Sequence, residues 1–181
     1  MNKLTCLAAA FAVFAMPASA GLPVGSKAPT FATQAAKAGK SSGFNLRSAL
    51  AKGPVVLYFF PKAFTKGCTL EANAFAEATP EFSRYGATVI GMSNDDIETL
   101  KRFSKEECRD KFAVAAATPK IVDAYDAALV REGKATGLTS RTSYVIDQRA
   151  RIVFVHEDLD YKDHVRLTLE AVKKLKAKTK G

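Results

Sequence analysis

The feature that most constrains the fold is a continuous apolar run at residues 55–60, which Pro61 ends. An apolar run of this length between turn signals is typical of a strand buried on both faces, as in the centre of an α/β sheet. After Pro61 and a short loop, helix-forming composition extends from Cys68 to about Ala78, where Pro80 breaks or kinks the helix. We therefore expect a central strand, a short loop and a helix that begins at Cys68.

The rest of the chain alternates strand and helix patterns. We expect, in order, a loop at 21–42 with at most a short strand around Phe31, a strand at 87–92, a helix at 95–111 capped by Ser93, Asn94 or Asp95, a weak strand at 112–117, a short helix at 119–129, a hairpin of 143–147 and 151–155, and a helix from about Lys162. This order predicts an α/β fold with a mixed central β-sheet flanked by helices. The thioredoxin fold has the same order of elements.

The first twenty residues have the features of a secretory signal peptide. Lys3 supplies a basic start, residues 4–16 are apolar, and Ala18-Ser19-Ala20 after Pro17 offers a cleavage site. An N-terminal membrane anchor is the alternative, but the run is short for a span. We expect a signal peptide at 1–20, one domain at 21–181 without stable membrane insertion, and a periplasmic or secreted location. In such an oxidising compartment the two remaining cysteines are able to form a disulfide.

The chain is basic, with a formal net charge of +9. Basic residues concentrate only near the C-terminus, at Lys173, Lys174, Lys176, Lys178 and Lys180. Apolar residues recur there at helical spacing, and no aromatic residues are interleaved with the lysines. The pattern therefore indicates the solvated face of a C-terminal helix and argues against nucleic-acid binding.

Cys68 is the first candidate for chemistry. At a helix N-terminus, free backbone N–H groups and the positive end of the helix dipole favour the thiolate over the thiol. Lys62 and Lys66 add positive charge, and Thr65 and Thr69 add hydroxyl groups. The alternative is a half-buried cysteine that acts as a small hydrophobic residue or as one end of a stabilising disulfide. From the residues alone, both interpretations stay open.

A family resemblance favours the reactive interpretation. Residues 61–71, PKAFTKGCTLE, resemble the peroxiredoxin active-site signature Pro-x-x-x-Thr-x-x-Cys. The wider form Pro-Lys-x-x-Thr-x-Gly-Cys-Thr resembles the bacterioferritin comigratory protein (peroxiredoxin Q) subfamily. Residues 24–31, 53–60, 86–93 and 140–147 resemble, in the right order, the family's entry segment, central strand, next strand and late strand.

The resemblance implies a role for each matching residue. Cys68 is then the peroxidatic cysteine, which attacks a peroxide oxygen and becomes a sulfenic acid. Thr65 orients sulfur and peroxide, Arg141 holds the thiolate and polarises the O–O bond, and Pro61 shields the pocket. Glu71 matches a residue type frequent in the family, but as a first-turn acid it also suits the helix dipole, so it is left outside the expected catalytic core.

The resemblance also implies where the cysteine that resolves the sulfenic acid could lie. Many members of the subfamily carry a second cysteine five residues after the first, where this chain has Asn73. Others carry it on the following helix, which is where we expect Cys108. A Cys68–Cys108 disulfide, reduced by a thioredoxin-like partner, is therefore the leading hypothesis. The alternative is a one-cysteine enzyme in which Cys108 only packs in the core.

The implied partners are a peroxide, either hydrogen peroxide or an organic hydroperoxide, and a thiol reductant, with no metal, no cofactor and a monomeric enzyme. A thioredoxin-type oxidoreductase requires Cys-x-x-Cys, whereas this chain has Cys68-Thr69-Leu70-Glu71. A glutathione peroxidase requires a tryptophan in its catalytic tetrad, and the chain has none. Two non-enzymatic alternatives remain. One is a copper metallochaperone, although His156 and His164 are the only histidines and are expected to be ordinary polar residues. The other is a basic envelope-binding domain stabilised by a Cys68–Cys108 disulfide.

Overall fold

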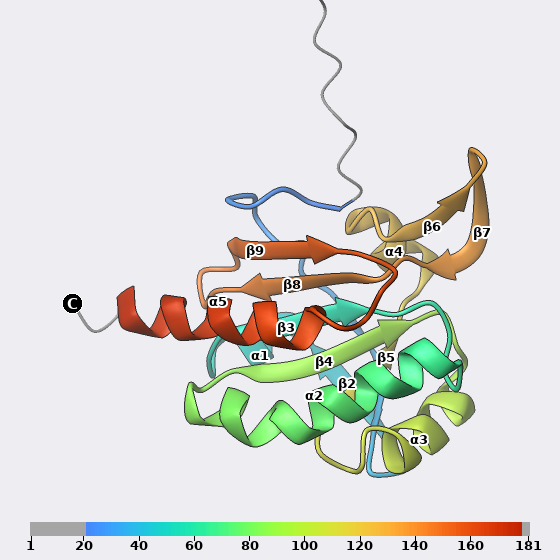
Figure 1. The fold of residues 1–181 in the computed structure, drawn as a ribbon, viewed down its shortest axis with the longest axis horizontal. Helices are drawn as coiled ribbons and strands as arrows, with labels where there is room; N and C mark the ends of the chain where they lie inside the picture. The colour runs from blue at the N-terminus through green and yellow to red at the C-terminus, as the bar shows by residue number, and fades with distance from the viewer. Residues whose placement is uncertain (1–20, 179–181) are drawn as a thin grey trace, which may run out of the picture.

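The computed structural model describes residues 21–178, so the expected signal peptide at 1–20 lies outside the described residues. Seven strands form one sheet in the order β2-β1-β5-β4-β3-β8-β9, and two more form a separate hairpin (Figure 1). The strands are β1 (Ala32–Lys37), β2 (Lys40–Asn45), β3 (Val55–Phe59), β4 (Thr88–Ser93), β5 (Ala113–Ala116), β6 (Ala128–Arg131), β7 (Lys134–Thr139), β8 (Thr142–Ile146) and β9 (Ile152–Glu157). Strands β3, β4 and β5 run parallel and the outer strands pair antiparallel, which confirms the expected mixed sheet.

Helices cover both faces of this sheet. They are α1 (Leu46–Leu50), α2 (Lys66–Arg84), α3 (Ile97–Glu106), α4 (Pro119–Ala124) and α5 (His164–Lys178). Buried side chains of α2, α3 and α5 form one core cluster with the sheet, and those of α1 and α4 form the other. Among residues 21–178, no helix combines the length and the apolar character of a membrane span.

Strand β3 lies between these two cores, as the apolar run predicts. Val56 and Tyr58 point into the cluster under α2, while Val55, Leu57 and Phe59 point into the opposite cluster. Every residue of β3 is buried. The strand is therefore fixed on both faces, and its C-terminal end is a rigid support for the loop that leads to Cys68.

The expectation of a loop at 21–42 is wrong for its second half. Residues 32–45 form the β1–β2 hairpin, whose turn has positive φ at Ala38 and Gly39, as in a type I′ turn. Most of these side chains are small or polar, so the sequence shows little apolar alternation. The hairpin is held instead by pairing with β5, where Ala35 and Ala36 are buried.

The short helix expected at 119–129 is also too long. Helix α4 ends at Ala124, and the chain then forms the β6–β7 hairpin, which the sequence did not predict. Its turn has positive φ at Glu132 and Gly133. Residues of β6 and β7 are mostly exposed, so this pair lacks the apolar pattern that usually reveals a strand.

Two helix boundaries differ from expectation. Helix α2 begins at Lys66, before Cys68, and continues through Pro80 because Phe75 and Phe82, on either side of the proline, are fully buried. Helix α3 is capped by Asp96, whose side chain accepts from the N–H of Thr99, and ends at Glu106. The late hairpin of β8 and β9 and the final helix are confirmed.

Candidate active site

Cys68 is the third residue of α2, just after the end of β3. Thr65 occupies the N-cap position, and its carbonyl accepts a hydrogen bond from the N–H of Thr69 at 2.9 Å. The cysteine side chain is 1% exposed, and the cysteine is free. The expected position of this sulfur at the start of a helix is therefore confirmed, although Cys68 lies within the first turn and does not open it.

Arg141 reaches Cys68 from a distant part of the chain. It directly precedes β8, which pairs with β3 so that Thr142 lies opposite Phe59. This register places Arg141 at the same end of the sheet as the start of α2. Its Nη2 donates to Cys68 Sγ at 3.5 Å, and its Nε donates to the carbonyl oxygen of Leu159 at 2.9 Å. The guanidinium is thus held beside the sulfur in a buried position.

Gly67 makes this close approach possible. A Cβ atom at Gly67 would lie 3.2 Å from Nη2 of Arg141, which is a tight contact. The family signature contains glycine at this position, and the structure gives a physical reason for it in this chain: the helix backbone and the guanidinium lie side by side.

Thr65 and Pro61 border the site in different ways. The hydroxyl of Thr65 donates to the carbonyl oxygen of Lys62 at 2.9 Å, and the residue is exposed. Pro61 is half-buried and borders an open hollow of about 660 Å³ beside the loop. The expected orienting role of Thr65 and the shielding role of Pro61 remain predictions.

Glu71 belongs to the site, although it was left outside the expected catalytic core. It is three residues after Cys68 and so lies on the same face of α2. Its side chain is fully buried, and its Oε2 forms an ion pair with Nη1 of Arg141. Burial raises the pKa of Glu71 to about 8, because the loss of water disfavours the carboxylate more than Arg141 stabilises it. The i, i+3 spacing was the signal that could have found this residue.

His164 forms the far wall of the site, so it is more than the ordinary polar residue that was expected. It is fully buried at the start of α5, and its Nδ1 lies 3.8 Å from Oε1 of Glu71. Its Nε2 is 2.9 Å from the carbonyl oxygen of Asp158, which can only accept, so Nε2 carries the proton. Nδ1 then accepts from the hydroxyl of Ser143 at 2.8 Å. Burial lowers the pKa of His164 to about 4.

The loop between β3 and α2 is anchored by Asp95, which the sequence suggested only as a helix cap. Asp95 Oδ2 accepts from the N–H of Ala63 at 2.8 Å and from the hydroxyl of Ser93 at 2.8 Å. The next residue, Phe64, has a φ of 63°, which a non-glycine residue rarely adopts. Asp95 is therefore a positioning residue for the loop.

Cys108 lies just beyond the end of α3, not on the helix as expected. It is free and fully buried, in the same core cluster as Cys68 and Tyr58. Burial raises the pKa of the Cys108 thiol well above its ordinary value. Asn73 of α2 donates to Glu107 at 3.1 Å, which ties this segment to the helix that carries Cys68.

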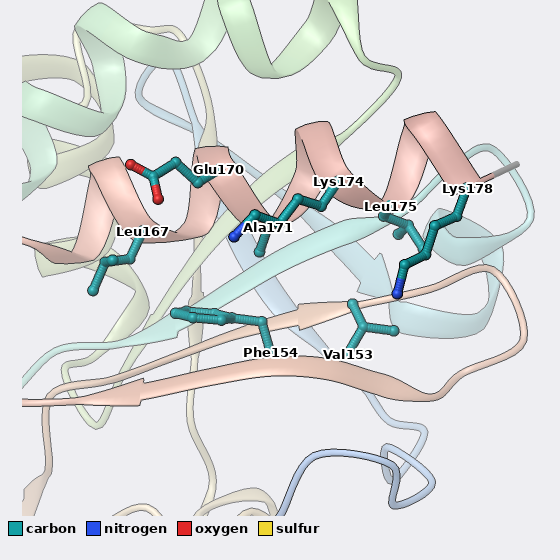
Figure 2. A pocket seen from close by; sticks show the side chains of 8 residues that line it. All are labelled: Val153, Phe154, Leu167, Glu170, Ala171, Lys174, Leu175 and Lys178. Carbon is teal, nitrogen blue, oxygen red and sulfur yellow. The ribbon is translucent and has the colours of Figure 1, made fainter. Parts of the chain in front are cut away.

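A groove between β9 and α5 lies apart from these residues. Figure 2 shows the apolar side chains of the two elements facing one another, with charged side chains from α5 at its border. The groove has a volume of about 370 Å³ and is lined by Val153, Phe154, Leu167, Glu170, Ala171, Lys174, Leu175 and Lys178. It contains none of the expected site residues. Within residues 21–178, no three His, Cys, Asp or Glu side chains are grouped to hold a metal ion.

Comparison with known proteins identifies the family of the chain. Residues 24–155 match the AhpC/TSA family. Peroxiredoxin Bcp of Bacillus subtilis (strain 168) is 29% identical over 126 residues, covering 68% of this chain and 80% of the relative. Chloroplastic peroxiredoxin Q of Triticum aestivum is 29% identical over 123 residues, covering 67% of this chain and 55% of the relative.

Solved structures agree on the fold. The crystal structure of peroxidoxin BcpB from Mycobacterium tuberculosis superposes with a TM-score of 0.74 at 25% identity, covering 84% of this chain and 97% of that one. This likeness confirms the thioredoxin-like arrangement of the sheet and its helices. The chain therefore belongs to the AhpC/TSA family and is a peroxiredoxin, a thiol peroxidase of the Bcp and peroxiredoxin Q type.

Proposed function

We propose that the protein reduces hydrogen peroxide and organic hydroperoxides at Cys68. The thiolate of Cys68 attacks one peroxide oxygen, the O–O bond breaks, and the leaving oxygen takes a proton to become water or an alcohol. The sulfur is left as a sulfenic acid. The observation that carries this proposal is the 3.5 Å contact between Arg141 Nη2 and Cys68 Sγ at the start of α2. The fixed guanidinium stabilises the thiolate and the charge that develops on the leaving oxygen.

Cys108 is proposed to resolve the sulfenic acid. Its thiol condenses with the sulfenic acid to form a Cys68–Cys108 disulfide and water, and a thioredoxin-like dithiol then reduces the disulfide. Both cysteines lie in one core cluster, but both are buried. Both are free in this structure, so the cycle requires the two sulfur atoms to come within bonding distance after Cys68 is oxidised.

A one-cysteine cycle is the second candidate, and the burial of Cys108 favours it. A fully buried thiol with a raised pKa is a poor nucleophile, because the thiolate is the reactive form. In that cycle an external thiol attacks the sulfenic acid of Cys68 directly, and Cys108 remains a core residue.

Turnover of three proteins tests the function and separates the two cycles. Wild type, Cys68→Ser and Cys108→Ser are assayed with thioredoxin and with dithiothreitol. We expect no peroxide consumption without Cys68, and wild-type activity in that variant would contradict the function. We expect Cys108→Ser to form the sulfenic acid in the first turnover but to lose thioredoxin-dependent cycling. A persistent sulfenic acid in the wild type after one equivalent of peroxide, without an intramolecular disulfide, would support the one-cysteine cycle.

Export to the periplasm or beyond, and action as a monomer, complete the proposal. The signal-like character of residues 1–20 supports export. N-terminal sequencing of the protein from a periplasmic fraction tests it, with Gly21 as the expected first residue. Sedimentation at micromolar concentration tests the monomer.

A further inference from the structure

The buried site contains one cation for two acids. Arg141 donates through Nη2 to Cys68 and through Nη1 to Glu71. The side chains of Cys68 and Glu71 are 1% and 0% exposed, so water does not screen either group. If both acids are ionised, one guanidinium faces two buried anions and the site carries an uncompensated negative charge. Such a charge is strongly disfavoured in a buried position.

Glu71 has a further reason to keep a proton. Its Oε1 has no hydrogen-bond partner and lies 3.8 Å from Nδ1 of His164. Nδ1 carries a lone pair, because Nε2 donates to the carbonyl oxygen of Asp158. That lone pair already accepts from the hydroxyl of Ser143 at 2.8 Å, so His164 offers no donor to Oε1, and a buried carboxylate oxygen without a donor is disfavoured. The environment on this side therefore favours the carboxylic acid.

We propose that Cys68 and Glu71 share one proton. Glu71 is protonated when Cys68 is the thiolate, so that the charge of Arg141 stabilises the thiolate alone. This inference rests on the proposed function and adds a positioning residue to it. The exchange is balanced: a Cys68 thiol and a Glu71 carboxylate become a thiolate and a carboxylic acid, with no change in the charge of the site. The two groups titrate as a coupled pair.

The other groups around Glu71 agree with this assignment. Tyr58 of β3 faces both acids, and its pKa is raised by burial and then by the nearby charges, so it stays a neutral phenol. His164 of α5 stays neutral above a pKa of about 4 and provides no second cation. Burial raises the pKa of Glu71 to about 8, which also favours its carboxylic acid form.

Three further titratable groups lie just outside the residues that contact Glu71. The ring of His156 on β9 packs on His164 with centroids 4.5 Å apart. Asp158 and Asp160 precede α5. Asp160 pairs with Lys162, and this hydrogen bond, together with a smaller effect of the charge of Arg141, lowers the pKa of its carboxyl group. Asp158 contacts His164 through its backbone carbonyl. These groups act on Glu71 only through Arg141 or His164.

The direct test is the pH titration of the Cys68 thiolate by its ultraviolet absorbance, in a Cys6→Ser, Cys108→Ser background so that one thiol titrates. We expect Glu71→Gln to move the midpoint to lower pH by about one unit, because the amide still accepts from Arg141 but never competes as an anion. If Glu71 acted only by charge to hold Arg141 in place, the midpoint would rise instead. A rise or an unchanged midpoint would overturn the inference. Glu77→Gln, on the same helix but paired with exposed Arg109, is the matched control and should leave the midpoint unchanged.

A reciprocal test needs no change at Glu71. Infrared difference spectra follow the C=O stretch of the protonated carboxyl group as pH rises, in wild type and in Cys68→Ser. Without a competing thiolate, Arg141 serves Glu71 alone, so we expect the carboxyl band of Cys68→Ser to disappear at lower pH than in wild type. Equal midpoints would contradict the inference. Peroxide consumption by wild type is measured on the same samples, so that loss of the function and loss of the proton coupling are distinguished.

Discussion

The backbone N–H of Ala63 donates to Asp95 Oδ2 at 2.8 Å, which ties the loop before Cys68 to the end of β4. The same oxygen accepts from Ser93, so the carboxylate is itself fixed. Phe64, next in the loop, has a φ of 63°, a conformation that is strained by about 1 kcal/mol or more for a non-glycine residue. The loop therefore depends on its anchor to keep its shape.

Removal of this anchor should both slow the chemistry and lower the stability of the fold. In Asp95→Ala, the N–H of Ala63 loses its acceptor and the loop relaxes, so the sulfur and the guanidinium are less well placed for attack. We expect the rate of sulfenic acid formation to fall about tenfold, with a loss of about 1–3 kcal/mol of stability. Stopped-flow kinetics and urea unfolding measure the two effects.

Asp96→Ala is the matched control for this variant. Asp96 caps α3 through the N–H of Thr99 at 2.9 Å, so its loss removes a helix cap without touching the loop. We expect the rate to be unchanged in this control. Equal rates for Asp95→Ala and Asp96→Ala would show that the loop needs no anchor.

The predictable parts of the fold were those with an apolar pattern. The run at 55–60 predicted β3 because each of its residues enters one of two cores. The β1–β2 and β6–β7 hairpins escaped prediction because their side chains are largely small, polar or exposed. Each hairpin turns at a dipeptide with positive φ, Ala38-Gly39 in one and Glu132-Gly133 in the other. Neither dipeptide is among those common at such turns, so the sequence carries no clear turn signal there.

The site was predictable where a local motif existed. The position of Cys68 near a helix start followed from the strand and the proline, and Arg141 followed from a family resemblance. Glu71 offered one local signal, its i, i+3 spacing from Cys68, but its role and that of His164 depend on burial and on pairing between α2, α5 and the sheet. Asp95 escaped because an acid before a helix is usually its cap, a role that here belongs to the next residue.

Gly67→Ala separates helix stability from site geometry. Alanine is a better helix former than glycine, so the variant should be as stable as wild type or more so. Its Cβ would lie 3.2 Å from Nη2 of Arg141, and the guanidinium must move away. We expect the rate of peroxide reduction to fall about fivefold. Gly43→Ala in β2 has open space around the new Cβ and serves as the control, with an unchanged rate; an equal rate for the two variants would contradict the argument.

Arg141→Lys tests whether the fork of the guanidinium matters beyond its charge. Arg141 donates to Cys68, Glu71 and the carbonyl oxygen of Leu159 from three different nitrogens. A lysine ammonium keeps the charge but lacks this fixed geometry. We expect the second-order rate constant for peroxide to fall about 100-fold. Arg166→Lys, at an exposed arginine of α5, should keep the wild-type rate. Activity of Arg141→Lys within twofold of wild type would show that charge alone is sufficient.

His164 should make stability depend on pH in the acid range. Burial lowers its pKa to about 4, against 6.5 for the ordinary side chain, so the folded protein resists protonation that the unfolded chain accepts. The stability that depends on neutral His164 is therefore complete above pH 6.5, decreases as the pH falls from 6.5, and is lost by about pH 4. The free energy of unfolding of wild type, measured relative to that of His164→Gln, should fall by about 3 kcal/mol across this window. Carboxylates that titrate in both proteins cancel in the difference. A difference that is constant with pH, from urea unfolding at several pH values, would show that His164 is protonated as easily in the fold as in the unfolded chain.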